Sequence, residues 1–228
     1  MCERAVNAGP ELLIFDCDGV LVDSEVLAAQ AYDDVLKGIG VEVPSDLWTK
    51  CVGLKQAEIF GLIEAATNRV VTPETREKLW PRTQKLFEAE LKPTPGLRDF
   101  LDASRIRRCV ASSSSPERIR SSLTLTGLVS YFEDIFSTQY VARGKPAPDI
   151  FLYACEKMGV APDKAVVIED SCPGVQGARA AGTHVIGYLG GAHVGKGHAE
   201  RLQVAGAAFV AKDWEQIRDY LAGAPLGG

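Results

Sequence analysis

Residues 12–25, "LLIFDCDGVLVDSE", run from four apolar residues into two aspartates, Asp16 and Asp18, which a single cysteine separates. Four consecutive apolar residues are typical of a strand that is covered on both faces, as in a parallel sheet. Two carboxylates this close repel each other unless a positive charge lies near them. The stretch therefore predicts a buried strand that ends at a polar site with a source of positive charge.

Short apolar runs of the same kind follow along the chain: "RRCVASSS", "EDIFST", "AVVIED", "THVIGYL" and "AAFVAKD". Amphipathic helical patterns lie between them, several with Ser, Asp or Pro near the start and Gly at the end. Alternating strands and helices are typical of parallel strands joined by right-handed crossovers. We therefore predict an α/β fold whose core is a doubly wound, Rossmann-like parallel sheet.

Residues 27–92 do not follow this alternation, since they contain amphipathic helical patterns and no convincing strand. The chain returns to the alternation at "KPTPGL", where two prolines and a glycine resemble a hinge. We predict a catalytic core of residues 1–26 and 93–228 and an inserted all-helical cap of residues 27–92. Because the insertion follows the first strand directly, the cap would lie over the strand ends.

The composition is that of an ordinary globular protein, with 228 residues, 46% hydrophobic residues and a net charge of −5. The mildly acidic balance and the lack of a basic patch argue against nucleic acid as a partner. No apolar run reaches the roughly 18 residues of a membrane helix, and the first residues lack the apolar centre of a secretion signal. We expect a cytoplasmic protein that acts on a small molecule. The sequence indicates no oligomeric state.

Polar residues stand at the predicted strand ends: Asp16 and Asp18, residues 112–114, and Glu169 with Asp170. In doubly wound sheets the ligand binds beyond the carboxyl ends of the strands. Several carboxylates, completed by waters and a substrate phosphate, form the kind of site that Mg²⁺ prefers. The alternative is that these residues only cap helices and form turns.

Lys145 lies in "ARGKPAPDIF", in a loop before a predicted helix. Near the other strand ends it could neutralise both a phosphate and a carboxylate, although most lysines are solvated surface charges. Residues 190–197, "GGAHVGKG", have no dinucleotide-binding spacing, and we interpret them as a flexible surface loop. His184, His193 and His198 lack the spacing of a metal site on one helix and receive no role.

Four of these segments, "DCDGVLVDSE", "VASSS", "GKPAPDIF" and "VVIEDSCPGVQGARAAG", together resemble the sequence motifs of the haloacid dehalogenase superfamily. Their order and spacing are similar to those of its phosphatases. The chain resembles most the branch that includes β-phosphoglucomutase, phosphoglycolate phosphatase and small sugar phosphatases. The resemblance covers the whole chain, and the helical insertion stands where that branch has its cap.

This resemblance implies a role for each matching residue. Asp16 would be the nucleophile that forms an aspartyl-phosphate, and Asp18 would be the general acid and base, able to keep a proton at the start. Ser112 and the backbone N–H of Ser113 would donate to the phosphoryl group, whose charge Lys145 would stabilise. The implied ligands of Mg²⁺ are Asp16, the backbone carbonyl of Asp18, Glu169 and Asp170.

The implied function is that of a Mg²⁺-dependent phosphomonoesterase, a hydrolase acting on a sugar phosphate or sugar-acid phosphate. Hexose-phosphate mutase and phosphoglycolate phosphatase remain alternatives. Ala28 stands where β-phosphoglucomutases have a histidine, which counts against a mutase. A phospho-receiver module, the alternative outside enzymes, has about half this length and no helical insertion. We also hypothesise that Lys55 contacts an anionic substrate group, against the alternative of an ordinary surface lysine.

Overall fold

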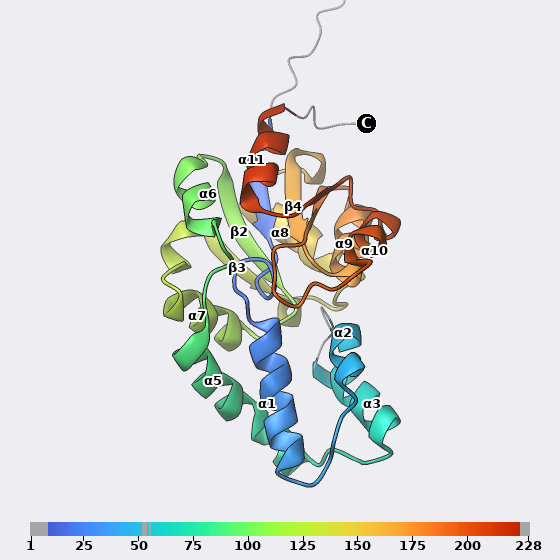
Figure 1. The fold of residues 1–228 in the computed structure, drawn as a ribbon. Helices are drawn as coiled ribbons and strands as arrows, with labels where there is room; N and C mark the ends of the chain where they lie inside the picture. Colours follow the sequence, from blue (N-terminus) through green and yellow to red (C-terminus); the bar gives the residue numbers. More distant parts are fainter. Residues whose placement is uncertain (1–8, 52–53, 55, 224–228) are drawn as a thin grey trace, which may run out of the picture.

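The computed structural model describes residues 9–51, 54 and 56–223, and its centre is a six-stranded parallel sheet (Figure 1). The strand order is β3-β2-β1-β4-β5-β6, so the order reverses at β1, which pairs with β2 on one side and β4 on the other. The predicted doubly wound sheet is confirmed, because each apolar run in the sequence forms a strand. The strands are β1 (Leu12–Phe15), β2 (Arg107–Ser112), β3 (Asp134–Ser137), β4 (Ala165–Glu169), β5 (His184–Tyr188) and β6 (Phe209–Ala211).

Helices cover both faces of the sheet, and β1 shows why its sequence is apolar throughout. Successive side chains of a strand point to opposite faces. Leu13 and Phe15 pack against α6, α7 and α11, whereas Leu12 and Ile14 pack against α8, α9 and α10, and all four are fully buried. Each such burial contributes roughly 1.5–3 kcal/mol to folding. The helices are α6 (Leu97–Ala103), α7 (Pro116–Leu125), α8 (Asp149–Met158), α9 (Cys172–Ala180), α10 (His198–Ala205) and α11 (Trp214–Gly223).

The segment between β1 and β2 is helical and forms a layer beyond the carboxyl ends of the strands, drawn below the sheet in Figure 1. It has an apolar cluster of its own, which includes Tyr32, Leu36, Phe60 and Ile63. This agrees with the predicted helical cap, and its limits at residues 27 and 92 stay a prediction. The helices are α1 (Glu25–Lys37), α2 (Trp48–Cys51), α3 (Gln56–Thr67), α4 (Pro73–Glu77) and α5 (Leu79–Glu90).

Two chain segments connect the sheet to this layer, and they lie side by side. Val22 forms a bridge with Pro93, and the amide of Asp23 donates to the carbonyl of Lys92 at 3.0 Å. Nearby, the hydroxyl of Thr94 donates to the carbonyl of Val20 at 2.7 Å. The two segments that join the helical layer to the core are therefore hydrogen-bonded to each other at the edge of the predicted site.

One helix of the core, α10, has no signal in the sequence. Gly197 precedes it with a left-handed φ of 74°, and the glycine-rich stretch before it lacks the Ser, Asp or Pro that usually marks a helix start. Leu202 and Ala205 are buried against the sheet. Packing of these two side chains therefore stabilises a helix that local sequence does not announce.

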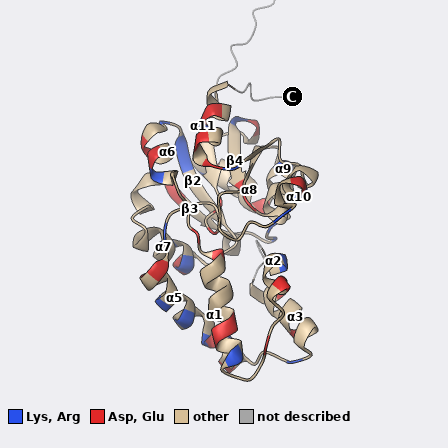
Figure 2. Ribbon diagram, in the orientation of Figure 1, with Lys and Arg blue, Asp and Glu red and all other residues tan. Residues whose placement is uncertain are grey.

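Single 3₁₀ turns complete the described secondary structure, at Ser45–Leu47, Val129–Tyr131, Thr138–Tyr140 and Pro162–Lys164. Residues of both charges lie on helices such as α1 and α5 (Figure 2). Within the described ranges, no helix has both the length and the apolar character that crossing a membrane requires.

Candidate active site

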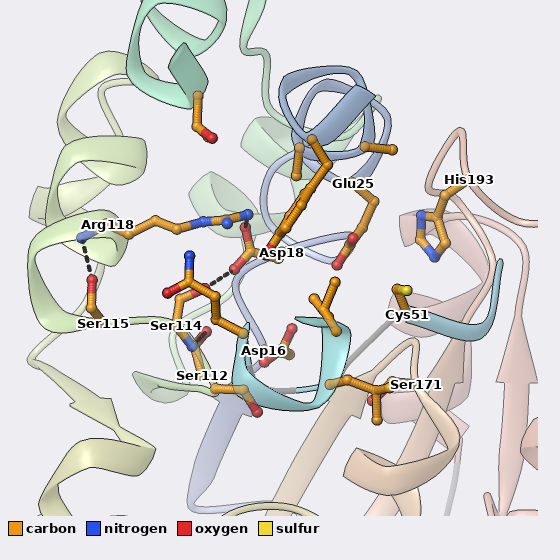
Figure 3. Close-up of a pocket in the computed structure, with 18 of the residues that line it drawn as sticks. Asp16, Asp18, Glu25, Cys51, Ser112, Ser114, Ser115, Arg118, Ser171 and His193 are labelled. Atoms are coloured by element: carbon orange, nitrogen blue, oxygen red, sulfur yellow. Dashed lines mark hydrogen bonds and ion pairs between the residues drawn. The ribbon is translucent and has the colours of Figure 1, made fainter. Parts of the chain in front are cut away.

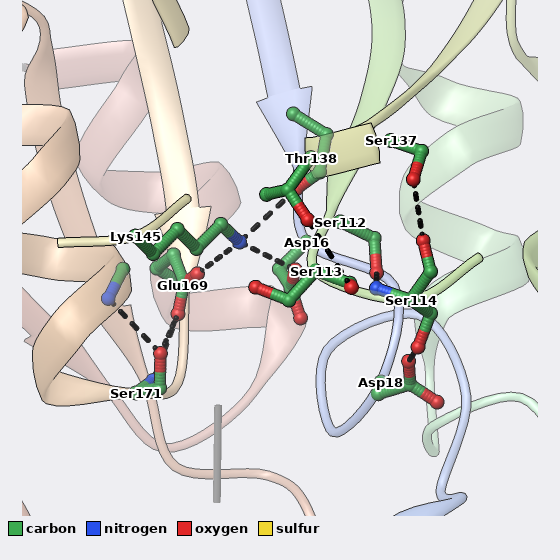
Figure 4. A network of polar contacts seen from close by, with 12 residues as sticks. Asp16, Asp18, Ser112, Ser113, Ser114, Ser137, Thr138, Lys145, Glu169 and Ser171 are labelled. Atoms are coloured by element: carbon green, nitrogen blue, oxygen red, sulfur yellow. Dashed lines mark hydrogen bonds and ion pairs between the residues drawn. The ribbon is translucent and has the colours of Figure 1, made fainter. Parts of the chain in front are cut away.

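The ends of three neighbouring strands meet at one cavity of about 580 Å³ between the sheet and the helical layer. Asp16 follows β1, Ser112 ends β2 and Glu169 ends β4, so the parallel sheet itself brings these side chains together. Figure 4 shows them around the amino group of Lys145. The residues predicted for catalysis, with Ser113 and Glu169, all line the cavity.

Lys145 supplies positive charge between the carboxylates. Its Nζ donates to Asp16 Oδ1 at 2.6 Å, to Glu169 Oε1 at 2.5 Å and to the carbonyl of Ala111 at 3.1 Å. The side chain is only 2% exposed, and these three acceptors match the three protons of an ammonium group. Burial alone would lower the pKa of Lys145, but Asp16 and Glu169 outweigh burial and hold this pKa above its ordinary value. Lys145 therefore stays protonated.

Asp16 is one of the two buried carboxylates that contact Lys145. Burial raises the pKa of Asp16 well above its ordinary value, and the neighbouring acids Glu169, Asp170 and Asp18 add to the rise. Lys145 opposes these effects without cancelling them. The site thus concentrates more negative charge around Asp16 than one lysine neutralises.

Asp18 faces a different set of groups. It accepts hydrogen bonds from Ser24 Oγ and Ser114 Oγ, each at 2.6 Å, and from Arg118 Nη2 at 2.8 Å (Figure 3). Burial by itself raises the pKa of Asp18, but Arg118 and the two serines together lower it below its ordinary value. The expectation that Asp18 keeps a proton is therefore wrong for this arrangement, because a buried arginine stabilises the ionised carboxylate.

The serine segment after β2 turns back on itself. The hydroxyl oxygen of Ser112 accepts from the amide of Ser114 at 3.1 Å, which leaves the proton of this hydroxyl available to a ligand. The carbonyl of Ser113 accepts from Thr138 Oγ1 at 3.3 Å, and the carbonyl of Ser114 accepts from Ser137 Oγ at 2.7 Å. The end of strand β3 and the 3₁₀ turn that follows it therefore fix the backbone of these serines (Figure 4).

Glu169 is positioned by the helix that follows β4. Its Oε2 accepts from the amide and the hydroxyl of Ser171, at 2.8 and 2.9 Å, while the same hydroxyl oxygen caps α9 by accepting from Gly174. A Cβ at Gly174 would overlap the Glu169 carboxylate, so this helix must carry a glycine here. With Lys145 on its other oxygen, Glu169 is held from both sides.

Asp170 contacts His193, a residue to which sequence patterns gave no role. His193 Nε2 lies 3.0 Å from Asp170 Oδ2. Burial lowers the pKa of His193, but the contact with Asp170 outweighs burial and raises this pKa above its ordinary value. His198 Nε2 lies 2.6 Å from the carbonyl of Asp170. Residues 190–197 were interpreted as a flexible surface loop; residues 192 and 195–197 are exposed, but the His193 side chain is only 7% exposed and points inward to Asp170.

A close approach of two backbone segments fixes this loop. A Cβ at Gly191 would meet the ring of His193 at 2.7 Å and the carbonyl of Gly19 at 2.9 Å, both too near for another residue. The amide of Ala192 donates to Asp23 Oδ1 at 3.0 Å. The loop is thus attached to the segment that carries Asp16 and Asp18. By contrast, His184 contacts Tyr220 at 2.9 Å, on α11.

Of the groups proposed for Mg²⁺, Glu169 already accepts from Lys145 and Ser171 through both carboxylate oxygens, whereas the others are compatible with a cation. Asp170 Oδ2 is buried beside His193 Nε2, and a Cβ at Gly19 would overlap this oxygen, so the backbone beside Asp18 approaches it closely. Asp16, Asp170 and the backbone carbonyl of Asp18 are oxygen donors of the kind Mg²⁺ prefers. Across the described ranges, however, no three His, Cys, Asp or Glu side chains are grouped so that they could hold a metal. The magnesium site stays a prediction.

Besides His193, sequence reasoning missed three residues of the site: Ser24, Glu25 and Arg118. Arg118 lies in "SPERIRSSL", where nothing distinguishes it from a surface arginine, and it meets Asp18 only because α7 lies against the strand ends. Ser24 and Glu25 belong to "DSE", the end of the first motif, where the sequence pattern indicates no chemistry for them. Lys55 lies outside the described residues, so its hypothesis stays untested.

Glu25 predicts a measurable pH dependence of stability. Burial, with the charges of Asp18 and Asp170, raises the pKa of Glu25 to about 7. The unfolded chain loses this proton near its ordinary value of 4.5, so stability is lost as pH rises from 4.5 to about 7. In EDTA, Glu25→Gln should therefore gain roughly 1–2 kcal/mol over the wild type at about pH 8, and almost nothing at about pH 4. Urea denaturation measures both differences.

The control for this prediction is Glu42→Gln, which changes an exposed carboxylate on the same helical layer. We expect it to alter stability equally at both pH values. A Glu25→Gln variant that behaves like this control would show that Glu25 ionises freely in the folded protein.

The sequence of this chain matches a known protein family. The family model described as haloacid dehalogenase-like hydrolase matches residues 13–188, which include all the strand ends described above except the last. The chain belongs to the haloacid dehalogenase-like hydrolases. It is 32% identical over 200 residues to a phosphorylated carbohydrates phosphatase of Thermotoga maritima, covering 86% of this chain and 93% of the relative.

Two further relatives support the same family. A fructose-1-phosphate phosphatase of Escherichia coli is 32% identical over 178 residues, covering 76% of this chain and 94% of the relative. The crystal structure of a haloacid dehalogenase-like protein of unknown function from Agrobacterium tumefaciens superposes with a TM-score of 0.83 at 36% identity, covering 94% of this chain and 98% of the other. The resemblance inferred from the four motifs is confirmed, and this haloacid dehalogenase-like hydrolase is a phosphatase with a Rossmann-like core.

Proposed function

We propose that this hydrolase is a Mg²⁺-dependent phosphomonoesterase for a small sugar phosphate and that it works through an aspartyl-phosphate on Asp16. The observation that carries the proposal is the buried contact of Lys145 with Asp16 at the floor of the cavity. A carboxylate in this place can attack phosphorus only if the charges around it are balanced. Lys145 provides one balancing charge, and a bound Mg²⁺ would neutralise the phosphate and the carboxylates further.

In the first step, an Asp16 oxygen attacks phosphorus, the bond from phosphorus to the ester oxygen breaks, and Asp18 gives its proton to the departing oxygen. In the second step, ionised Asp18 takes a proton from water, whose oxygen attacks phosphorus and releases Asp16 and inorganic phosphate. Arg118 lowers the pKa of Asp18, which favours the ionised state that the second step requires.

Ser112 and Lys145 are proposed to bind the phosphoryl group and to stabilise its charge. The free proton of the Ser112 hydroxyl can donate to a phosphoryl oxygen, and Lys145 lies on the other side of Asp16 to balance its charge. The backbone N–H of Ser113 is proposed as a further donor. The remaining volume of the cavity accepts the leaving group, since about 580 Å³ lies within the range of roughly 300–1,000 Å³ typical of small-molecule sites.

The substrate class is supported by the walls of the cavity and by the relatives. Tyr32, Trp48 and Trp80 line its outer part, and such rings present a flat apolar face together with a polar edge. Relatives that match most of the chain are phosphatases of phosphorylated carbohydrates and of fructose 1-phosphate. Ala28 also lines the cavity and cannot transfer a proton, which argues against the mutase alternative.

A screen of phosphorylated metabolites tests this function. We expect the purified protein with Mg²⁺ to release phosphate from at least one sugar phosphate, and EDTA to lower the rate roughly a hundred-fold or more, because the metal stabilises transition-state charge. Glucose 1-phosphate should be hydrolysed or left alone, but not isomerised. Isomerisation without phosphate release would establish the mutase instead, and preference for phosphoglycolate over all sugar phosphates would establish the other alternative.

A further inference from the structure

Arg118 is a cation of the cavity to which the proposed reaction assigns no contact with substrate. Its side chain is 22% exposed, and its Nη2 donates to Asp18 Oδ1 at 2.8 Å. The guanidinium lies over the ring of Phe87 on α5, with Cζ 5.3 Å from the ring centroid. Its Nε is buried and has no hydrogen-bond partner. Figure 3 shows Arg118 extending from α7 to Asp18.

The position of Arg118 places its donors near the leaving group. A guanidinium has five N–H donors in one plane, and the contact with Asp18 engages Nη2. Phe87 lies close to the guanidinium, so the ring covers part of it, and the donors that Phe87 and Asp18 do not cover remain for a ligand. Because Asp18 would protonate the ester oxygen, a donor of Arg118 can reach atoms of the leaving group next to that oxygen.

The charge of the cavity decides what kind of group Arg118 would bind. Among the described residues that line it, Asp16, Asp18, Glu25 and Glu169 are acidic, whereas Arg118, Lys145 and the titratable His193 are basic. Lys145 already contacts two of the acids. A second anionic group on the substrate would face this excess of carboxylates, whereas a hydroxyl accepts a hydrogen bond without adding charge.

We propose that Arg118 is a specificity-determining residue that donates a hydrogen bond to a hydroxyl on the carbon next to the ester-bearing carbon. The enzyme then selects phosphate monoesters of polyols over those of simple alcohols. This inference rests on the proposed phosphomonoesterase function and deepens it, because it names the feature of the leaving group that the site recognises.

The test compares glycerol 1-phosphate with the monophosphate of 1,3-propanediol, which lacks only the middle hydroxyl. A hydrogen bond from a charged donor corresponds to a preference of roughly ten- to hundred-fold in kcat/KM for glycerol 1-phosphate. We expect Arg118→Met to bring this ratio to within about threefold of unity, and Arg118→Lys to keep part of it. Arg120→Met, which changes an exposed arginine of the same helix, should keep the wild-type ratio.

The ratio separates recognition from other effects of the variant. An equal fall for both esters, with an unchanged ratio, would mean that Arg118 only positions Asp18, and the inference would be overturned. A wild-type ratio near unity would overturn it as well. If Arg118→Met is too slow to assay, calorimetric binding of both esters to Asp16→Asn, with and without Arg118→Met, decides the same question. If no ester is hydrolysed, the proposed phosphomonoesterase function is wrong. The binding comparison then still shows whether Arg118 recognises the middle hydroxyl.

Discussion

Replacing Asp16 with asparagine is expected to lower phosphate release at least about a thousand-fold, because the amide cannot form the acyl-phosphate bond. The amide has nearly the same shape as the carboxylate and still accepts from Lys145 Nζ, so the fold should remain. Steady-state phosphate release with Mg²⁺ measures the loss. Rapid quenching of the wild-type reaction, followed by mass spectrometry of the peptide that contains Asp16, should show a phosphorylated intermediate.

The matched control for this experiment is Asp163→Asn, which changes an exposed aspartate that precedes β4 at the opposite end of the sheet. Its activity should equal that of the wild type. If Asp16→Asn keeps more than about a tenth of the activity, the covalent route is wrong, and water attacks phosphorus directly in a site that only binds the phosphate.

Replacing Lys145 with methionine is expected to abolish activity and also to destabilise the fold by about 3–5 kcal/mol near neutral pH. Methionine fills a similar volume but leaves the carboxylates of Asp16 and Glu169 buried without a counter-ion, at side-chain exposures of 10% and 1%. It also removes the donor to the carbonyl of Ala111. Urea denaturation in EDTA measures the loss of stability, and phosphate release measures the loss of activity.

The pH dependence of this loss follows from the groups that titrate. The pKa of Lys145 is raised in the folded protein, so its stabilising contribution is complete below its unfolded pKa and is lost only at alkaline pH, as pH rises through the folded value. Between about pH 5 and 8 the difference therefore depends on Asp16, whose raised pKa lets it take up a proton in the variant at the acidic end. We expect a smaller loss at about pH 5 than at about pH 8.

An exposed lysine provides the control for Lys145. Lys157→Met, on the outer side of α8, should change stability by less than about 0.5 kcal/mol and leave activity unchanged. A similarly small effect of Lys145→Met on stability would show that the contacts of Lys145 with the two carboxylates contribute little to the stability of the folded enzyme.

The two acids that open the sequence differ more in the structure than their spacing suggests. Asp16 and Asp18 are two residues apart, yet one contacts Lys145 and has a raised pKa, while the other contacts Arg118 and has a lowered one. The motif could show that both acids belong to a site. It could not show their protonation states, because these depend on cations that are 129 and 100 residues away in the chain.

What the sequence by itself determined is the sheet and the residues at its strand ends. Runs such as "LLIF" are apolar at every position because both faces of a central parallel strand are covered, and this pattern is local. Once the strands are known to be parallel, Asp16, Ser112 and Glu169 must lie at one edge, since parallel strands end together. The four motifs then indicated the family, which the comparisons confirm.

Only the tertiary structure decided the surroundings of these residues. The contact of Arg118 with Asp18, the burial of His193 beside Asp170 and the helix α10 have no local signal, because each arises where segments distant in sequence pack together. An arginine on α7 or a histidine in a glycine-rich loop has the same local pattern whether it is solvated or buried. Its burial, its partners and therefore its charge are set by long-range packing.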